Sequence, residues 1–129
     1  MSNPVAIVTG GSSGIGQAIS VALANEGYQI VIVGRNLQRI EETLTLLPSP
    51  ESHRGLSLDV TQEEDMERMA QETIAQLGQI DLLIASAGVG RSADSKRFMP
   101  YPTASLPLTE WNAIINVNLK GVFLSNRAV

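Results

Sequence analysis

Three glycines near the start of the chain have the spacing and setting of a phosphate-binding turn. Gly10, Gly14 and Gly16 stand between an apolar run at residues 5–9 and a segment with helical hydrophobic periodicity at residues 15–23. One glycine of such a turn adopts a conformation that other residues avoid, another lets a pyrophosphate approach, and a third lets the helix pack on the strand. Since the start of a helix offers unpaired N–H groups and a positive dipole end, the pattern predicts an anion site.

Residues inside the turn extend this site. Ser12 and Ser13 offer hydroxyl donors to a phosphate, and Ile15 opens the helix that follows. A glycine turn without a ligand is the alternative interpretation. The helix is expected to bury a single apolar stripe, formed by Ile15, Ala18, Ile19, Ala22 and Leu23.

A cation follows the second predicted strand, which covers residues 30–33 and ends at Gly34, Arg35 and Asn36. Dinucleotide sites that select NAD place an acidic side chain near this point, where it holds the ribose 2′-hydroxyl. No acid stands here, and a guanidinium can pair bidentately with a 2′-phosphate. If the turn holds a dinucleotide, the sequence therefore favours NADP(H) over NAD(H). The alternative is that Arg35 is a solvated loop residue.

The elements that must position these residues alternate along the chain. Apolar runs predict strands at residues 5–9, 30–33, 56–60 and 80–85, with amphipathic helices between them. This alternation predicts an α/β fold of the Rossmann type, a doubly wound parallel sheet of about four strands in the order 3-2-1-4. The 129 residues suit one domain.

Several local signals complete this prediction. Thr61 and Glu64 have the spacing of a capping box for the third helix, and Thr109 is expected to cap the last helix. Met66 and Met69 are expected to fill the core rather than to bind a ligand. The lone His53 is expected at the surface, with no metal constellation around it.

Composition excludes several classes of function. The net charge of −4 and the isoelectric point near 4.9 argue against binding to nucleic acid or to an anionic membrane surface. The chain has no cysteine, so disulfide and thiolate chemistry are excluded. The start of the chain has no signal-peptide pattern and no apolar run is long enough to span a bilayer, so a cytoplasmic location is expected.

Four ordered segments together resemble one known family, the short-chain dehydrogenases/reductases. Residues 9–16 match its T-G-x-x-x-G-I-G signature. Asp59 and Val60 match the pair that follows its third strand, and residues 85–88 (Ala-Ser-Ala-Gly) stand where the family has N-N-A-G. Residues 116–123 are similar to the helix that carries its catalytic asparagine. The resemblance covers the whole chain but only the first half of the family's usual fold. It implies one NAD(P)-binding domain over residues 1–129 that is incomplete at its C-terminus.

The resemblance also implies roles for single residues. Asp59 and Val60 would contact the adenine, and Ala85, Ala87 and Gly88 would lie beside the nicotinamide ribose. Asn118 would be the catalytic asparagine, which holds a water in a proton relay; a structural asparagine is the alternative. Its spacing from Ile114 and Val122 predicts that Asn118 is buried with the apolar stripe. Because Ala85 and Ser86 replace two asparagines, the side-chain bracing of the sheet is in doubt.

The remaining catalytic residues of the family are not found in this chain. Hydride delivery to a carbonyl needs a matching proton, which relatives supply from a tyrosine with a lysine four residues later. Four residues after Tyr28 stands Ile32, and four after Tyr101 stands Ser105. We therefore expect this chain to be the cofactor-binding half of an NADP(H)-dependent oxidoreductase that acts on a small carbonyl or alcohol substrate. The resemblance also allows a homo-oligomer. The alternatives are a non-catalytic dinucleotide-binding module and an inactive fragment.

A long irregular stretch, residues 89–108, follows the fourth predicted strand. Loops of this length in compact domains are often functional. Arg91, Lys96 and Arg97 could attract an anionic substrate, and the alternative is an ordinary solvated loop.

Overall fold

A computed structural model describes residues 2–129 as a parallel four-stranded sheet flanked by helices. The strand order is β3-β2-β1-β4, which confirms the predicted order. The strands are β1 (Val5–Thr9), β2 (Gln29–Gly34), β3 (Arg54–Ser57) and β4 (Leu82–Ala85). In the central strand, Ile7 pairs with Val31 of β2 and with Leu83 of β4.

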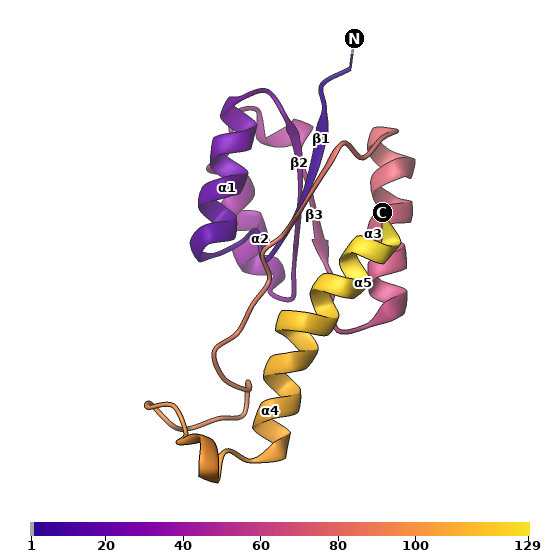
Figure 1. Ribbon diagram of the computed structural model, residues 1–129. Helices are drawn as coiled ribbons and strands as arrows, with labels where there is room; N and C mark the ends of the chain where they lie inside the picture. The colour runs from indigo at the N-terminus through magenta and orange to yellow at the C-terminus, as the bar shows by residue number, and fades with distance from the viewer. Residues whose placement is uncertain (1) are drawn as a thin grey trace.

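The helices form a layer on each face of this sheet. They are α1 (Gly14–Asn25), α2 (Leu37–Leu44), α3 (Glu63–Leu77), α4 (Leu108–Ile115) and α5 (Gly121–Ala128). Figure 1 shows α1 and α2 on one side of the sheet and α3 and α5 on the other. A single π-helical turn, Asn116–Lys120, joins α4 to α5, so that the two form one continuous rod.

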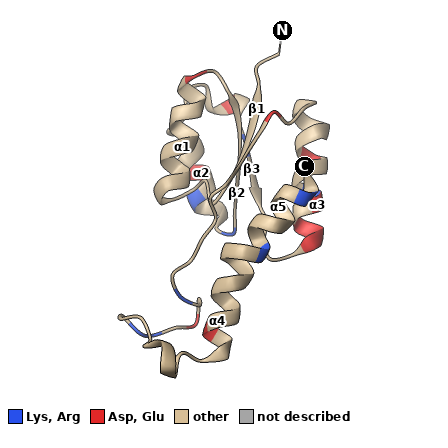
Figure 2. Ribbon diagram, viewed as in Figure 1, with Lys and Arg blue, Asp and Glu red and all other residues tan. Residues whose placement is uncertain are grey.

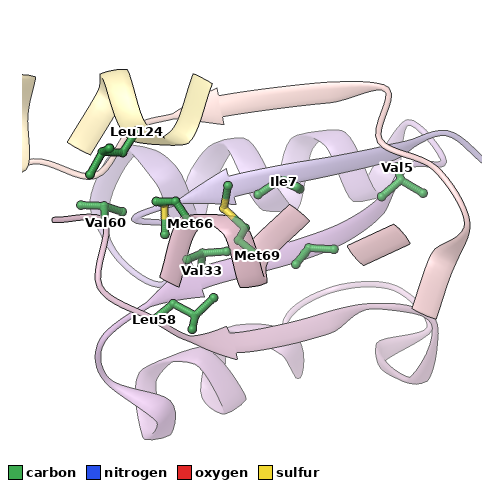
Figure 3. Packing of buried hydrophobic residues seen from close by; sticks show 9 residues of the cluster. Val5, Ile7, Val33, Leu58, Val60, Met66, Met69 and Leu124 are labelled. Atoms are coloured by element: carbon green, nitrogen blue, oxygen red, sulfur yellow. The ribbon is translucent and has the colours of Figure 1, made fainter. Parts of the chain in front are cut away.

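Alternate residues of the central strands supply the two halves of the core. Val5 and Ile7 pack with α3 and α5, whereas Ala6 and Val8 pack with α1 and α2. This alternation follows from the two-residue repeat of a strand, and it explains why the runs are apolar throughout. Met66 and Met69 are fully buried in the first half, as predicted (Figure 3).

Helix α1 buries a different face from the one that its hydrophobic periodicity predicted. Ile15 is 78% exposed, and the buried positions are Gly16, Ser20 and Ala24. These small residues let the helix approach the sheet closely, and the Ser20 hydroxyl is satisfied because it donates to the Gly16 carbonyl at 2.9 Å. Close packing of backbone on backbone therefore outweighs burial of the larger side chains.

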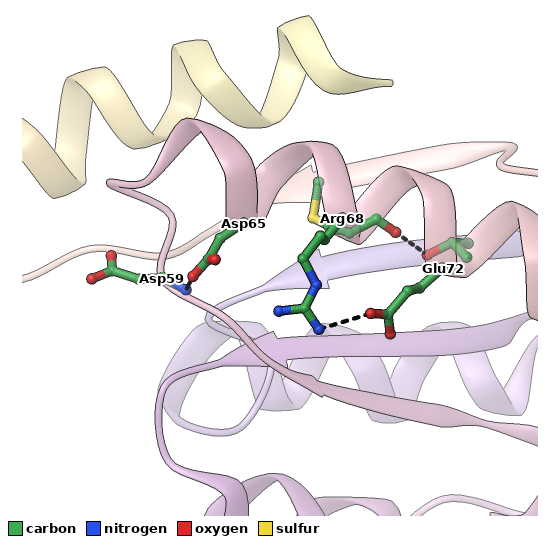
Figure 4. Close-up of polar contacts among 6 residues, drawn as sticks. Asp59, Asp65, Arg68 and Glu72 are labelled. Carbon is green, nitrogen blue, oxygen red and sulfur yellow. Dashed lines mark hydrogen bonds and ion pairs between the residues drawn. The ribbon is translucent and has the colours of Figure 1, made fainter.

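Two predicted helix caps were wrong. The Thr61 hydroxyl does not cap α3; it donates to Asp59 Oδ1 at 2.8 Å. Instead Asp65, in the first turn of α3, accepts from the Asp59 N–H at 2.8 Å (Figure 4). Thr109 lies inside α4, whose N-cap is Pro107. At α3 a nearby side chain supplies an alternative partner that the local sequence pattern does not reveal, whereas α4 begins without a side-chain cap.

His53 is buried, not at the surface as expected, with only 5% of its area exposed. Its Nδ1 accepts from the Ile30 N–H at 3.0 Å, so the proton lies on Nε2, which donates to the Pro48 carbonyl at 2.8 Å. The imidazole thereby ties the turn before β3 to the start of β2. Among residues 2–129 there is no group of acids and histidines that could hold a metal ion.

The outer edge of the sheet and the helical rod leave apolar groups uncovered. Within the described chain, β4 pairs only with β1. Trp111 on α4 is 51% exposed and Phe123 on α5 is 57% exposed. None of the helices described is both long and apolar enough to cross a bilayer.

Candidate functional site

A cleft of about 300 Å³ opens where the carboxyl ends of the strands meet. This is the position at which open parallel sheets bind ligands. Most of the predicted cofactor-binding residues line it: Gly10, Ser12, Ser13, Arg35, Asn36, Asp59, Val60, Ala87 and Gly88. Gly14, Ile15, Gly16 and Ala85 do not line it, although they belong to the elements that shape it.

The glycine turn after β1 requires its glycines for two different reasons. Gly10 and Gly14 have left-handed backbones, with φ of +64° and +53°. A Cβ at Gly16 would lie 2.1 Å from the Gly10 carbonyl oxygen, so this glycine lets α1 pack against the turn. A Cβ at Gly14 would meet nothing within 4 Å. The space at Gly14 agrees with a backbone that a ligand approaches closely.

The start of α1 is available to an anion. The Ser13 side chain makes no capping hydrogen bond, although Ser13 is the N-cap residue. Regular helical bonding begins when the Gln17 N–H donates to the Ser13 carbonyl, so the first-turn N–H groups precede it. The Ser12 and Ser13 residues line the cleft beside these donors. This end of the helix therefore has the donor set that a phosphate requires.

Two arginines lie where β2 ends. Arg35 and Asn36 line the cleft as predicted, and so does Arg39 in the first turn of α2, which the sequence analysis missed. The Asn36 side chain caps α2 by accepting from the Arg39 N–H at 3.1 Å. Figure 2 shows basic residues gathered at the start of α2. Arg35 precedes the helix, so no helical spacing relates it to Arg39 in the sequence.

Asp59 is held in place by its own turn. Its Oδ1 accepts from the N–H and the hydroxyl of Thr61, at 2.9 and 2.8 Å. The carboxylate lies on the far side of the backbone from Asp65, as Figure 4 shows, and the residue lines the cleft together with Val60. Val60 is also part of the core, since it packs with Met66 and Leu124. Packing in the core therefore holds this backbone in place on one side, and its other side faces the cleft.

The doubt about bracing at the end of β4 is removed by Ser86. Its hydroxyl donates to the Thr9 carbonyl at 2.5 Å, and the Ala87 N–H donates to the Thr9 hydroxyl at 3.3 Å. These bonds connect the end of β4 to the end of β1, where Ala85 pairs with Thr9. A serine therefore connects the two strand ends in this chain, where two asparagines were expected.

Asn118 is exposed, so the prediction of a buried asparagine was wrong. Its amide group pairs with the backbone of Val89: Oδ1 accepts from the N–H at 2.8 Å, and Nδ2 donates to the carbonyl at 2.9 Å. Asn118 lies in the π-helical turn, in which the Gly121 N–H bonds to the Asn116 carbonyl. The inserted residue rotates the side chain away from the stripe that a regular helix predicts, and such turns are frequent at functional sites.

A sequence profile described as "short chain dehydrogenase" matches residues 4–129. This chain belongs to the short-chain dehydrogenase family. It is 37% identical over 126 residues to D-threitol dehydrogenase of Mycolicibacterium smegmatis, a match that covers 97% of this chain and 45% of that protein.

Solved structures agree with this assignment. An alcohol dehydrogenase from the archaeon Thermococcus sibiricus, complexed with 5-hydroxy-NADP, has a TM-score of 0.84 and 31% identity, covering 97% of this chain and 51% of that one. An NAD⁺-bound xylitol dehydrogenase has a TM-score of 0.88 and 26% identity, covering 99% of this chain and 47% of that one. The chain spans about half the length of the relatives it matches.

Neither tyrosine of this short-chain dehydrogenase chain has a lysine four residues later. Tyr28 packs beside the core face that α1 and α2 cover. Tyr101 lies in the long loop, beneath the guanidinium of Arg97 at 4.3 Å from its ring centre. Asn118 reaches the cleft through Val89, whose backbone it pairs with and which lines the cleft.

Proposed function

We propose that this chain is the dinucleotide-binding domain of an oxidoreductase that uses NADP(H) to interconvert a small carbonyl compound and its alcohol. The observation that supports this most strongly is the cleft itself. It places the glycine turn, the arginines after β2, the acid after β3 and the backbone after β4 around one space. Each is a group that the binding of a dinucleotide requires, and each comes from a different strand end.

The protein's own residues would bind and orient such a cofactor. The start of α1 with Ser12 and Ser13 would hold the pyrophosphate, Asp59 and Val60 the adenine, and residues 85–88 the nicotinamide ribose. The bound nicotinamide would supply the hydride. Asn118 would act on the side of the cleft where the substrate binds, because its amide holds the backbone of Val89, the residue that follows Gly88.

Preference for NADP(H) rests on Arg35 and Arg39. Both line the cleft where β2 ends, and the residue that ends β2 is Gly34, so no carboxylate there would repel a 2′-phosphate. The relatives compared above include one with an NADP derivative and one with NAD⁺, so family membership alone leaves the choice open.

Titration with NADPH and NADH, followed by calorimetry, tests the proposal. NADPH should bind at least about tenfold more tightly than NADH, since charge-assisted pairs at the 2′-phosphate are strong. Arg35→Gln should remove most of this difference while leaving NADH binding unchanged. Arg68→Gln is the matched control, because Arg68 is exposed and pairs with Glu72 on α3. Tighter binding of NADH would contradict the NADP(H) preference, and failure of both cofactors to bind would refute the whole proposal.

A dinucleotide-binding module without catalysis is the second candidate. It is favoured by the lack of a tyrosine–lysine pair in these 129 residues. Consumption of NADPH by the purified chain with carbonyl substrates would exclude the module. A coding sequence that continues past Val129 into a tyrosine with a lysine four residues later would also exclude it, whereas binding without turnover agrees with both candidates.

Self-association is a further part of the proposal. The exposed Trp111 and Phe123 give the rod of α4 and α5 an apolar side that a second copy could cover. Light scattering at increasing protein concentration would detect it, and a strictly monomeric chain would contradict it.

A further inference from the structure

A second cavity, of about 560 Å³, adjoins the cofactor cleft. It lies between the irregular segment 90–101 and α4, and residues 86–107 connect β4 to that helix beside the rod in Figure 1. The two spaces meet along the backbone, because Val89 lines the cleft and Gly90 lines the cavity. A molecule in this cavity would therefore lie next to the end of the cleft that Gly88 and Val89 line.

Specific contacts hold the walls of this cavity in place. Ser92 donates to both carboxylate oxygens of Glu110, its N–H to one at 2.8 Å and its hydroxyl to the other at 2.5 Å. Arg97 stacks on Tyr101 and donates to the Met99 carbonyl at 3.1 Å. These contacts give the segment a defined shape. An ordinary solvated loop would not need such contacts.

The cavity is basic in an acidic chain. Within residues 90–101, Arg91, Lys96 and Arg97 outnumber the single acid, Asp94, whereas the whole chain has a net charge of −4. Arg91 and Arg97 line the cavity, and Lys96 does not. Arg91 donates one Nη1 bond to the Arg97 carbonyl at 2.8 Å. Arg97 donates from Nε to the Met99 carbonyl and from Nη2 to the Pro100 carbonyl at 3.3 Å, so its Nη1 group remains for a ligand, as do the Nε and Nη2 groups of Arg91.

Glu110 offsets the charge of one of the two arginines, which leaves the lining with a net positive charge. Its carboxylate also lines the cavity, but both of its oxygens are bonded to Ser92. The hydrogen bonds from the Ser92 side chain and backbone lower the pKa of Glu110, and the charge of Arg91 lowers it further. The rest of the lining is apolar and includes Phe98, Met99 and Ile114. Phe98 is 93% exposed, so an apolar ligand group would cover it.

We propose that this cavity binds a small organic anion, a carboxylate or phosphate monoester with an apolar or aromatic body, through Arg91 and Arg97. Arginine suits both anions because its planar fork matches their oxygens. In the context of the proposed function, the anion would be the substrate, with its reacting carbon directed toward the cofactor cleft. That assignment rests on the proposed function, whereas binding of the anion requires no cofactor.

Titration of the isotope-labelled chain by NMR, without cofactor, tests the site. The probes are benzoylformate, its neutral methyl ester and phenyl phosphate. Benzoylformate or phenyl phosphate should shift the backbone amides of residues 90–101, and the ester should shift them far less. Arg91→Gln should weaken binding of the anion about tenfold, the usual effect of losing a charged hydrogen bond. Lys96→Gln is the matched control, which removes the same charge from the same loop and should weaken binding less than about twofold.

Each result bears on one claim. Stronger binding of benzoylformate than of phenyl phosphate identifies a carboxylate site, and the reverse identifies a phosphate site. Equal binding of the ester, or equal losses from Arg91→Gln and Lys96→Gln, would overturn the proposal. If the anion binds but NADPH does not, the site stands and the proposed oxidoreductase function fails. If NADPH binds but neither anion does, the function stands and the site fails.

Discussion

The cofactor cleft and the adjoining cavity differ in what builds them. The cleft is made of backbone at the ends of β1, β2, β3 and β4, where sheet hydrogen bonds and close glycine packing set the geometry. The cavity is made by an irregular segment that side chains hold, chiefly through Ser92 with Glu110 and Arg97 with Tyr101. A substitution that adds atoms to a closely packed glycine should therefore disrupt the cleft. A substitution that removes a hydrogen-bonding atom should disrupt the cavity.

This difference fits a division of labour between a common ligand and a variable one. Dinucleotide cofactors share a pyrophosphate, so a rigid backbone cradle suits this common part. A substrate differs between enzymes, and a loop whose side chains determine its shape can vary without disturbing the sheet. The following substitutions test how distinct the two regions are, beginning with the largest expected effect.

Gly16→Ala should be the most damaging change. The new Cβ would lie 2.1 Å from the Gly10 carbonyl oxygen, so α1 must move away from the turn. We expect the free energy of unfolding in urea to fall by about 3 kcal/mol or more, the upper range for overpacking. Gly14→Ala is the control, because the new Cβ would meet no atom within 4 Å. Only the strain of an alanine in a left-handed conformation should lower the free energy of unfolding, by about 1 kcal/mol. Equal losses would show that packing is not the cause.

The same substitution placed in each region should act differently. Ser86→Ala removes the bond that joins the ends of β4 and β1, and should lower the free energy of unfolding by about 1 to 2 kcal/mol. Ser92→Ala removes the bonds of its hydroxyl to Glu110 and should loosen only the loop. Urea unfolding measures the first effect, and hydrogen exchange at residues 90–101 measures the second. A purely local effect of Ser86→Ala would contradict the comparison.

Asn118→Ala should loosen the point where the two regions meet. The substitution removes both hydrogen bonds between the side-chain amide and the Val89 backbone. Because these bonds are exposed, we expect the free energy of unfolding to fall by about 1 kcal/mol and the Val89 amide to exchange faster. Asn116→Ala is the control in the same π-helical turn, at an exposed position. If both variants exchange alike at Val89, the amide pairing does not hold the loop.

Acid should release the loop only below the ordinary pKa of a carboxyl group. Because the pKa of Glu110 is lowered in the folded state, its stabilising contribution is complete above the ordinary value of 4.5 and is lost as the pH falls through the lowered value. Hydrogen-bond signals of the Ser92 amide, followed by NMR below pH 4.5, should report this loss. Glu110→Gln should loosen the loop at neutral pH and remove the pH dependence, whereas Glu67→Gln on the exposed face of α3 should change neither. The same profile in both variants would exclude Glu110 as the cause.

Much of the cofactor cleft could be predicted from the sequence. The strand order, the glycine turn and the polar residues at the strand ends are local signals, and the parallel topology brings them to one edge. Arg39 was missed because it belongs to the next helix, and Ser86 was undervalued because its partner, Thr9, is far away in the chain. The sequence indicated that Arg91 and Arg97 could attract an anion, but the shape of the cavity could not be predicted, since its contacts connect residues that no periodic pattern relates.

The sequence by itself determined the order of strands and helices, although it placed β3 at residues 56–60 and the structure places it at Arg54–Ser57, and it determined that the strand ends carry the groups of a dinucleotide site. Only the tertiary structure decided which face of α1 is buried, that His53 is inside, and that Asn118 faces Val89 rather than the core. The physical reason is common to the three. Periodicity shows which residues share a face, but backbone packing at Gly16, hydrogen bonds from distant residues and one π-helical turn select the face that neighbours cover.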